Sequence, residues 1–176
     1  MPPLSASDTT PHFAVIVMGV SGCGKSTLGS LLGTALDAPF LEGDDFHAPE
    51  AVAKMRAGQA LTDDDRWPWL DRIGVAANAA ITDRGRTVIA CSALRAAYRA
   101  RLRAAMAAPV RFILLENSRE RLLARLAVRA DHYMPTSLLD SQLATLERPD
   151  EDEGAMILTT DADPCALRDA ALRWLR

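Results

Sequence analysis

One glycine-rich segment holds the clearest chemical signal in the sequence. Residues 19–26 read GVSGCGKS, which matches the pattern G-x-x-x-x-G-K-[S/T] at every fixed position. An apolar run over residues 13–18 predicts a strand before this segment, and an amphipathic pattern over residues 25–36 predicts a helix after it. A loop in this context binds phosphate, because its N–H groups converge on one anion and the helix adds its positively polarised N-terminus. A plain glycine-rich turn is the alternative, and the flanking strand and helix argue against it.

The side chains of this loop predict a site for ATP and Mg²⁺. Lys25 would bring a compact positive charge to the β- and γ-phosphates, and the Ser26 hydroxyl would be a ligand of Mg²⁺. Only Lys25 and Lys54 are lysines among the 20 basic residues, which favours a specific need for an ammonium group in the loop. The thiol of Cys23 lies beside the predicted helix N-terminus, where the positive potential favours the reactive thiolate form. We expect nucleotide contacts from Gly19, Ser21, Gly22, Cys23, Gly24, Lys25 and Ser26.

Acidic residues follow the second predicted strand, residues 38–41. The carboxyl ends of parallel strands meet at one edge of a sheet, so we expect Glu42, Asp44 and His47 to lie beside the phosphate loop. There Asp44 would accept or orient the proton of an attacking hydroxyl group, and Glu42 would lie behind the Mg²⁺ ion and order its waters. The alternative for Asp44 is that it only caps the following helix.

Residues 48–84 are the least regular part of the chain and predict the binding region of a second substrate. Within it, residues 61–70 read LTDDDRWPWL and predict a long helix that opens near Pro68. The acidic side chains of this segment can hold a polyol by hydrogen bonds, while Arg66 can bind a carboxylate of the same ligand. Alternatively, the three acids only stabilise the start of the helix.

Two arginines follow the third predicted strand, residues 87–90. Arg95 and Arg99 are four residues apart on a predicted helix, residues 95–107, so they share one face. Because this helix begins at the carboxyl edge of the sheet, we expect both side chains to point into the cleft.

A basic stripe follows the fourth predicted strand, residues 110–115. The predicted helix over residues 119–129 carries Arg121, Arg125 and Arg129 on one face. An irregular stretch, residues 130–135, separates it from another predicted helix, and this arrangement is typical of a lid that brings cations over bound phosphates. A solvated basic face is the alternative.

Length and composition predict one domain. The chain has 176 residues with 49% hydrophobic and 24% charged residues, which are ordinary values for a globular protein. Strands and helices alternate along it, which predicts a parallel α/β fold of three layers, an α/β/α sandwich. Residues 1–11 are expected to be a disordered tail, and residues 12–176 a single domain.

Charge and cysteine content limit the partners. A net charge of −3 argues against binding to nucleic acid or to a membrane surface, so small molecules are the expected partners. Three scattered cysteines favour a reducing compartment, and no segment is apolar enough for a membrane span or a signal peptide. We therefore expect a cytoplasmic protein.

Several short motifs together resemble the gluconokinase family, a group of small P-loop kinases related in fold to shikimate and adenylate kinases. The motifs are the phosphate loop, GDDFH, KMRAG, LTDDDRWPWL, CSAL, RLAVRADHYMP and SQLATLERP. The resemblance extends over residues 13–160. It implies ATP-dependent phosphorylation of D-gluconate to 6-phospho-D-gluconate on a P-loop fold with five parallel strands in the order 2-3-1-4-5. It also implies a mobile lid at about residues 125–148, an acceptor-binding region at about residues 44–84, and in many members a homodimer.

The resemblance assigns further roles. Thr27 joins the loop residues that hold ATP and Mg²⁺, and Arg125 and Arg129 become lid cations on the nucleotide, Arg125 with a catalytic role beside Lys25 and Asp44. The implied contacts with the sugar acid are Asp44, His47, Asp65, Arg66, Arg99 and His132. The chain departs from the family in two places, since Ala51 stands where the family usually has Asn and Asp131 where it usually has Gly.

Two other functions fit parts of the pattern. A related kinase could phosphorylate shikimate or a nucleoside monophosphate, although a nucleotide acceptor would call for several arginines between the second and third strands, where this chain has acids. An ATP-dependent switch is the alternative from another class. It would be expected to carry an additional interaction domain, for which 176 residues leave little room.

Overall fold

Five parallel strands form one sheet in the order β2-β3-β1-β4-β5. The computed structural model describes residues 11–129 and 135–176, and all structural statements refer to these residues. The sheet consists of β1 (Phe13–Met18), β2 (Phe40–Glu42), β3 (Arg86–Ala90), β4 (Val110–Glu116) and β5 (Met156–Thr159). The strand order confirms the order that the family resemblance implied. The predicted tail, residues 1–11, lies outside the described residues apart from residue 11.

The central strand β1 is buried on both faces. It pairs in parallel with β3 on one side and with β4 on the other, and Ala14 to Met18 have no exposed surface. Alternate residues of β1 belong to two separate cores, with Ile16 on one face and Val17 on the other. A continuous apolar run without polar alternation is the sequence that a strand with two buried faces requires.

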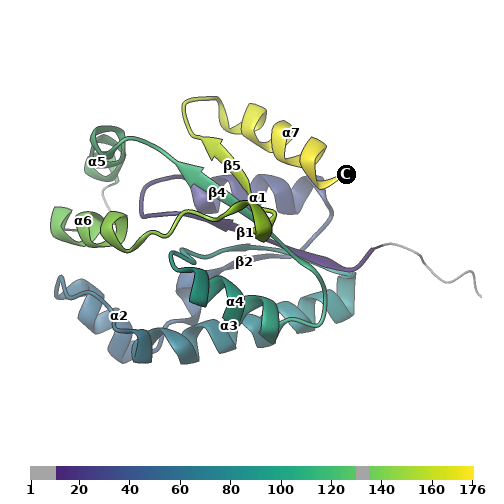
Figure 1. Cartoon of the computed structure of the whole chain (residues 1–176), viewed down its shortest axis with the longest axis horizontal. Helices are drawn as coiled ribbons and strands as arrows, with labels where there is room; N and C mark the ends of the chain where they lie inside the picture. The colour runs from purple at the N-terminus through teal and green to yellow at the C-terminus, as the bar shows by residue number, and fades with distance from the viewer. Residues whose placement is uncertain (1–10, 130–134) are drawn as a thin grey trace, which may run out of the picture.

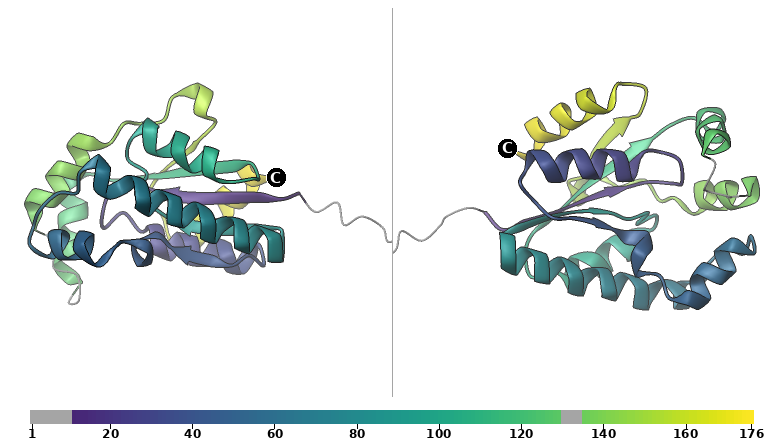
Figure 2. Two further views of the ribbon diagram at one scale, coloured as in Figure 1. Left: turned by 90° about the horizontal axis from the view of Figure 1, so that it is seen from below. Right: turned by 180° about the vertical axis from the view of Figure 1, so that it is seen from behind.

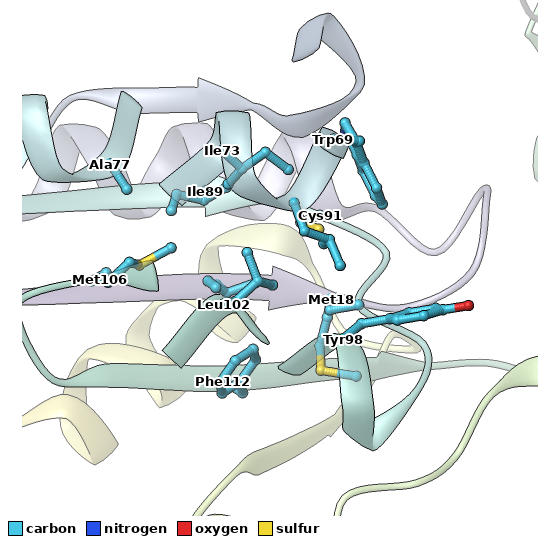
Figure 3. Packing of buried hydrophobic residues seen from close by; sticks show 14 of the residues in the cluster. Met18, Trp69, Ile73, Ala77, Ile89, Cys91, Tyr98, Leu102, Met106 and Phe112 are labelled. Atoms are coloured by element: carbon cyan, nitrogen blue, oxygen red, sulfur yellow. The ribbon is translucent and has the colours of Figure 1, made fainter. Parts of the chain in front are cut away.

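Helices cover both faces of this sheet. Helices α3 (Asp63–Arg84) and α4 (Ala96–Ala105) pack on one face, and α1 (Lys25–Ala35) and α7 (Pro164–Leu175) pack on the other (Figures 1 and 2). On the α3 and α4 face, Ile73, Leu102 and Phe112 are fully buried together (Figure 3). The predicted three-layer α/β/α sandwich is therefore confirmed.

Shorter elements gather beyond the carboxyl ends of the strands. Figure 1 shows α2 (Pro49–Arg56), α5 (Arg119–Val128) and α6 (Thr136–Thr145) at this end of the molecule. Two 3₁₀ turns complete the described chain, Gly43–Phe46 after β2 and Glu151–Glu153 before β5. No helix in the described ranges is long and apolar enough to cross a membrane.

Helix α3 begins at Asp63, before the start near Pro68 that the sequence predicted. Thr62 is the N-cap, its hydroxyl accepts a bond from the Asp65 N–H, and the Asp65 carboxylate accepts one from the Thr62 N–H. This capping box satisfies two N–H groups at the helix start and fixes it at Asp63. The expectation that the helix opens near Pro68 is wrong, because Pro68 lies inside a helix whose start the capping box sets.

A buried ion pair joins α4 to the 3₁₀ turn before β5. The guanidinium of Arg99 is completely buried and donates to both carboxylate oxygens of Glu153, at 2.5 and 2.7 Å. This hydrogen bonding holds the pKa of Glu153 below its ordinary value. The contribution of the charged pair to stability is complete above the ordinary carboxyl pKa and is lost as the pH falls through the lowered pKa of the folded state.

Removal of Glu153 should destabilise the fold strongly. In Glu153→Ala the buried Arg99 charge loses its counterion, which costs about 3 kcal/mol of unfolding free energy, since breaking one side of a buried pair leaves an uncompensated charge. Chemical denaturation at neutral pH measures this loss. The matched control is Asp71→Ala, which breaks a half-exposed pair with Arg101 of the same helix and should change stability far less. Equal losses in the two variants would contradict a special role for the buried pair.

Candidate active site

The phosphate loop connects β1 to α1 through backbone conformations that glycine adopts easily. Gly19, Gly22 and Gly24 have φ angles of 140°, 82° and 99°. At Gly19 a Cβ atom would lie 2.7 Å from the carbonyl oxygen of Leu115, so no larger residue fits beside β4. Both fixed glycines of the motif, Gly19 and Gly24, thus provide a backbone conformation with positive φ, and Gly19 also permits a close approach of two chain segments.

Lys25 and Ser26, the first two residues of α1, have partners that suit a phosphate site. The Lys25 ammonium group donates to the carbonyl oxygen of Val20 at 3.1 Å, so it lies back over its own loop. The Ser26 hydroxyl donates a short hydrogen bond to the carboxylate of Glu42, at the end of β2. Partial burial raises the pKa of Glu42, while the bond from Ser26 acts in the opposite direction.

The Ser26 and Glu42 pair fits a magnesium ion of the kind found in kinases. Mg²⁺ at such sites takes one or two oxygen ligands from the protein and the rest from phosphates and water. A hydroxyl and a carboxylate in contact at the start of the phosphate-binding helix supply this donor set. Within the described residues there is no cluster of three or more His, Cys, Asp or Glu side chains that could hold an ion without a nucleotide.

Asp44 and His47 lie on the 3₁₀ turn that follows β2 and just after it. The Asp44 side chain is 67% exposed, and its charge is close enough to Glu42 to raise the pKa of that residue. The His47 side chain is only 4% exposed, stacks on Trp69 with ring centroids 4.2 Å apart, and has Nε2 3.8 Å from the Asp44 carboxylate. Burial lowers the pKa of His47, so the neutral form is favoured. Asp44 is therefore open to a ligand, whereas His47 lies behind it.

Arg66 and Arg95 surround the ring of Tyr98. Arg66 donates to the Tyr98 hydroxyl at 2.8 Å, and Tyr98 in turn donates a short hydrogen bond to Asp63. Arg95 pairs with the other oxygen of Asp63 at 3.4 Å, and both guanidinium groups lie within 6 Å of the Tyr98 ring centroid, at 5.3 and 5.9 Å. The two cations share one carboxylate partner, which leaves net positive charge for a ligand anion.

Two of the residues predicted to contact the sugar acid, Asp65 and Arg99, form hydrogen bonds with other protein groups instead. Asp65 closes the capping box of α3 and also pairs with Lys54 at 2.7 Å, and these bonds lower its pKa to about 2. Arg99 is buried against Glu153 and donates to the carbonyl oxygens of Ala93 and Leu94. The contact predicted for Arg99 is therefore corrected, since none of its surface can reach a ligand. The structure gives Asp65 a helix-capping role.

The predicted basic stripe of α5 divides into different roles. Arg125 donates to the carbonyl oxygens of Cys23, at 3.3 Å, and Thr160, at 2.7 Å, so its guanidinium lies against the phosphate loop. Arg125 and Arg129 both line a pocket beside the loop, whereas Arg121 forms a short ion pair with Asp161. Two of the three stripe arginines therefore border this pocket. His132, the remaining predicted contact, lies outside the described residues.

A pocket of about 510 Å³ adjoins the phosphate loop. Its walls beyond the loop include Leu115, Ala124, Val128, Thr160, Ala162 and Pro164. An apolar cleft next to phosphate-binding N–H groups has the character of a site for the base and ribose of a nucleotide. The sequence pattern gave no signal for Val128 or Thr160, which come together only in the fold.

Cys23 does not have the accessibility that its position in the loop suggested. Its side chain is completely buried, and its sulfur lies 2.8 Å from the place where a Cβ on Gly19 would be. Cys91 is also buried, which raises the pKa of its thiol to about 12, while Cys165 is exposed. The expected reactivity of Cys23 is therefore corrected, because a reagent cannot reach the sulfur in the folded chain.

A parallel sheet in this order with a phosphate loop after its central strand defines a P-loop nucleotide-binding protein. A family model described as AAA domain matches residues 15–149. A gluconokinase of Arabidopsis thaliana is 42% identical over 156 residues, 82% of each chain, and one of Gluconobacter oxydans is 41% identical over 93% of this chain and 90% of its own. The chain therefore belongs to the gluconokinase family.

Solved structures agree with this assignment. A gluconokinase from Sinorhizobium meliloti 1021 superposes with a TM-score of 0.83 at 40% identity, covering 93% of this chain and 91% of that one. The APS kinase of Mycobacterium tuberculosis has a TM-score of 0.65 at 21% identity, with 94% and 98% covered. The second comparison shows a shared fold only.

Thiol labelling should distinguish the cysteines. We expect a small alkylating reagent to modify only Cys165 rapidly in the folded protein, because Cys23 and Cys91 are buried. Mass spectrometry of the labelled chain measures this, and Cys165→Ser should abolish the rapid phase. Denatured protein, in which all three thiols react, is the control. Rapid labelling of Cys23 that ATP prevents would instead support an accessible loop thiol.

Proposed function

We propose that this protein transfers the γ-phosphoryl group of ATP to D-gluconate and forms 6-phospho-D-gluconate. The observation that carries the proposal is the exposed Asp44 carboxylate at the carboxyl edge of the sheet, beside the Ser26 and Glu42 pair of the phosphate site. Support also comes from relatives that bear the name gluconokinase at 36–43% identity.

The proposed reaction is an in-line displacement at the γ-phosphorus. Asp44 accepts or orients the proton of the primary hydroxyl of gluconate, which attacks the phosphorus as the bond to ADP breaks. Lys25 and Arg125 balance the charge that builds on the transferred group, and the loop N–H groups hold the phosphates. Little covalent chemistry is required of the protein, so positioning provides most of the rate enhancement.

The acceptor carboxylate would be bound by Arg66 and Arg95. Their guanidinium groups are held by the hydroxyl and ring of Tyr98, so they are ordered before a ligand arrives. An anion bound there would add the counter-charge that Asp63 alone does not supply. His47, whose Nε2 atom lies 3.8 Å from the Asp44 carboxylate, remains a predicted contact of the sugar acid.

Ser26 and Glu42 would hold Mg²⁺ together with the nucleotide, Ser26 as a direct ligand and Glu42 through water. When bound, the ion would neutralise phosphate charge. Arg129 and His132 remain predicted contacts of a lid over residues 125–148, and Asp65 remains a predicted contact of the sugar acid. The homodimer and the cytoplasmic location also stay predictions.

A coupled assay over a panel of acceptors tests the proposed substrate. We expect ADP release to depend on D-gluconate and to be at least about a hundredfold slower with shikimate, whose hydroxyl groups are all secondary and fixed on a ring, or with a nucleoside monophosphate, which has no carboxylate. The phosphorylated product is identified by mass spectrometry. Faster turnover with any other acceptor would reassign the substrate, and ADP release without an acceptor would favour an ATP-dependent switch.

Asp44→Asn should slow catalysis without loss of fold. The amide keeps the shape of the side chain but cannot accept the proton, so the turnover number should fall by about 10²–10⁴-fold while ATP affinity stays near normal. Asp45→Asn, a change of the exposed neighbour on the same 3₁₀ turn, is the matched control. A purely capping Asp44 would behave differently, because Asn caps helices about as well as Asp. Wild-type turnover in a folded Asp44→Asn variant would therefore rule out the catalytic role.

A further inference from the structure

The side chain of Gln142 on helix α6 forms a hydrogen bond with the phosphate loop. The side-chain oxygen of Gln142 accepts a hydrogen bond from the backbone N–H of Ser21 at 2.7 Å, across 121 residues of sequence. Ser21 is the third residue of the loop, and its N–H is directed at the Gln142 side chain. The sequence motifs assigned no role to Gln142.

The hydrogen bond from Ser21 to Gln142 involves a peptide unit that also binds Lys25. The carbonyl oxygen of Val20 accepts from the Lys25 ammonium group at 3.1 Å, and the N–H of the same peptide bond, on Ser21, donates to Gln142. The peptide unit is therefore bound at both ends. A cation on the carbonyl polarises the peptide and strengthens the N–H as a donor, so the two bonds support each other.

The position of Gln142 is set by its helix. Leu139, one turn earlier, is fully buried in the core that also contains Val20 and Cys23. Asp140 pairs through both oxygens with Arg119 of α5, at 2.7 and 3.1 Å. Packing of Leu139 holds α6 against the loop, whereas the half-exposed ion pair joins α6 to α5, so the glutamine is presented by an ordered element that does not depend on the pair.

We propose that Gln142 is a positioning residue for phosphoryl transfer. It fixes the Val20–Ser21 peptide in the orientation in which its carbonyl holds Lys25, and it ties α6 to the phosphate loop. The first effect preorganises the loop for ATP. The second keeps the helix close to the γ-phosphate position and limits the access of water, and this part rests on the proposed transfer to gluconate.

Each effect has its own consequence. A preorganised loop loses less conformational freedom when a nucleotide binds, so removal of the bond should weaken ATP binding. A helix released from the loop lets water compete with the acceptor hydroxyl, so more ATP should be hydrolysed for each acceptor phosphorylated. A residue that only stabilises the fold would lower the melting temperature without changing this ratio.

The test compares Gln142→Met with wild type. Methionine keeps the length and packing of the side chain but offers only a weak acceptor. We expect the dissociation constant of ATP, measured by titration calorimetry, to rise about three- to tenfold, the range for loss of one hydrogen bond. The ratio of ATP hydrolysed to gluconate phosphorylated should rise at least about threefold. Gln142→Asn, shorter by one methylene, should show the same changes.

Asp140→Asn is the matched control on the same helix. It weakens the ion pair with Arg119 but leaves the Gln142 side chain intact, so ATP affinity and the hydrolysis ratio should stay within about twofold of wild type. Unchanged values in Gln142→Met, or equal changes in Asp140→Asn, would overturn the proposal. Tighter ATP binding in Gln142→Met would overturn it too, since Gln142 would then be a competitor of phosphate. If wild type did not phosphorylate gluconate at all, the proposed function would fail, while the calorimetry would still decide the role in nucleotide binding.

Discussion

The close passage of Gly19 beside β4 is the constraint on which the site depends. Just after β1, the N–H of Gly19 donates to the carbonyl oxygen of Ser92 at 3.2 Å. On its other side Gly19 lies so close to the carbonyl oxygen of Leu115 that a side chain would not fit. The loop therefore emerges between the ends of β3 and β4, the two neighbours of the central strand. Because β2 lies beyond β3 and β5 beyond β4, the predicted acceptor residues come to one side of the loop and the predicted nucleotide residues to the other.

The charge of its hydrogen-bond partners distinguishes an arginine with a structural role from one that can bind a ligand. Arg99 and Arg121 pair with the carboxylates of Glu153 and Asp161, so their charge is neutralised within the protein. The partners of Arg125 are carbonyl and hydroxyl oxygens of the loop region, which carry no net charge. A guanidinium held by neutral dipoles keeps its full charge while its position is fixed, which is the condition for electrostatic stabilisation of a phosphoryl group in transfer.

The sequence was sufficient for the fold and for the phosphate loop, because each depends on contiguous patterns. Apolar runs, the glycine spacing and the lysine at position 25 can each be interpreted from neighbouring residues in the sequence. The role of Arg99 could not be predicted, since it depends on Glu153, 54 residues away, whose carboxylate reaches it only in the folded chain. Asp65 was ambiguous for another reason, because the same side chain type serves as a helix cap and as a ligand for hydroxyl groups. The burial of Cys23 likewise follows from packing against other elements.

Glu147 connects the predicted acceptor side of the site with the predicted nucleotide side. Glu147, directly after α6 and its C-cap, accepts from the N–H of Ala96 at 2.7 Å and donates its own N–H to the carbonyl oxygen of Leu94 at 2.8 Å. Ala96 begins α4, whose Tyr98 holds Arg66. Two hydrogen bonds with backbone groups thus fix Glu147 to the start of α4 and to Leu94 just before it, so a displacement of α6 relative to the sheet would end at this residue. The arginines proposed for the acceptor, Arg66 and Arg95, lie on the α4 side of this point and Gln142 on the other. A displacement of α6 would therefore change the predicted nucleotide site while these two arginines keep their places.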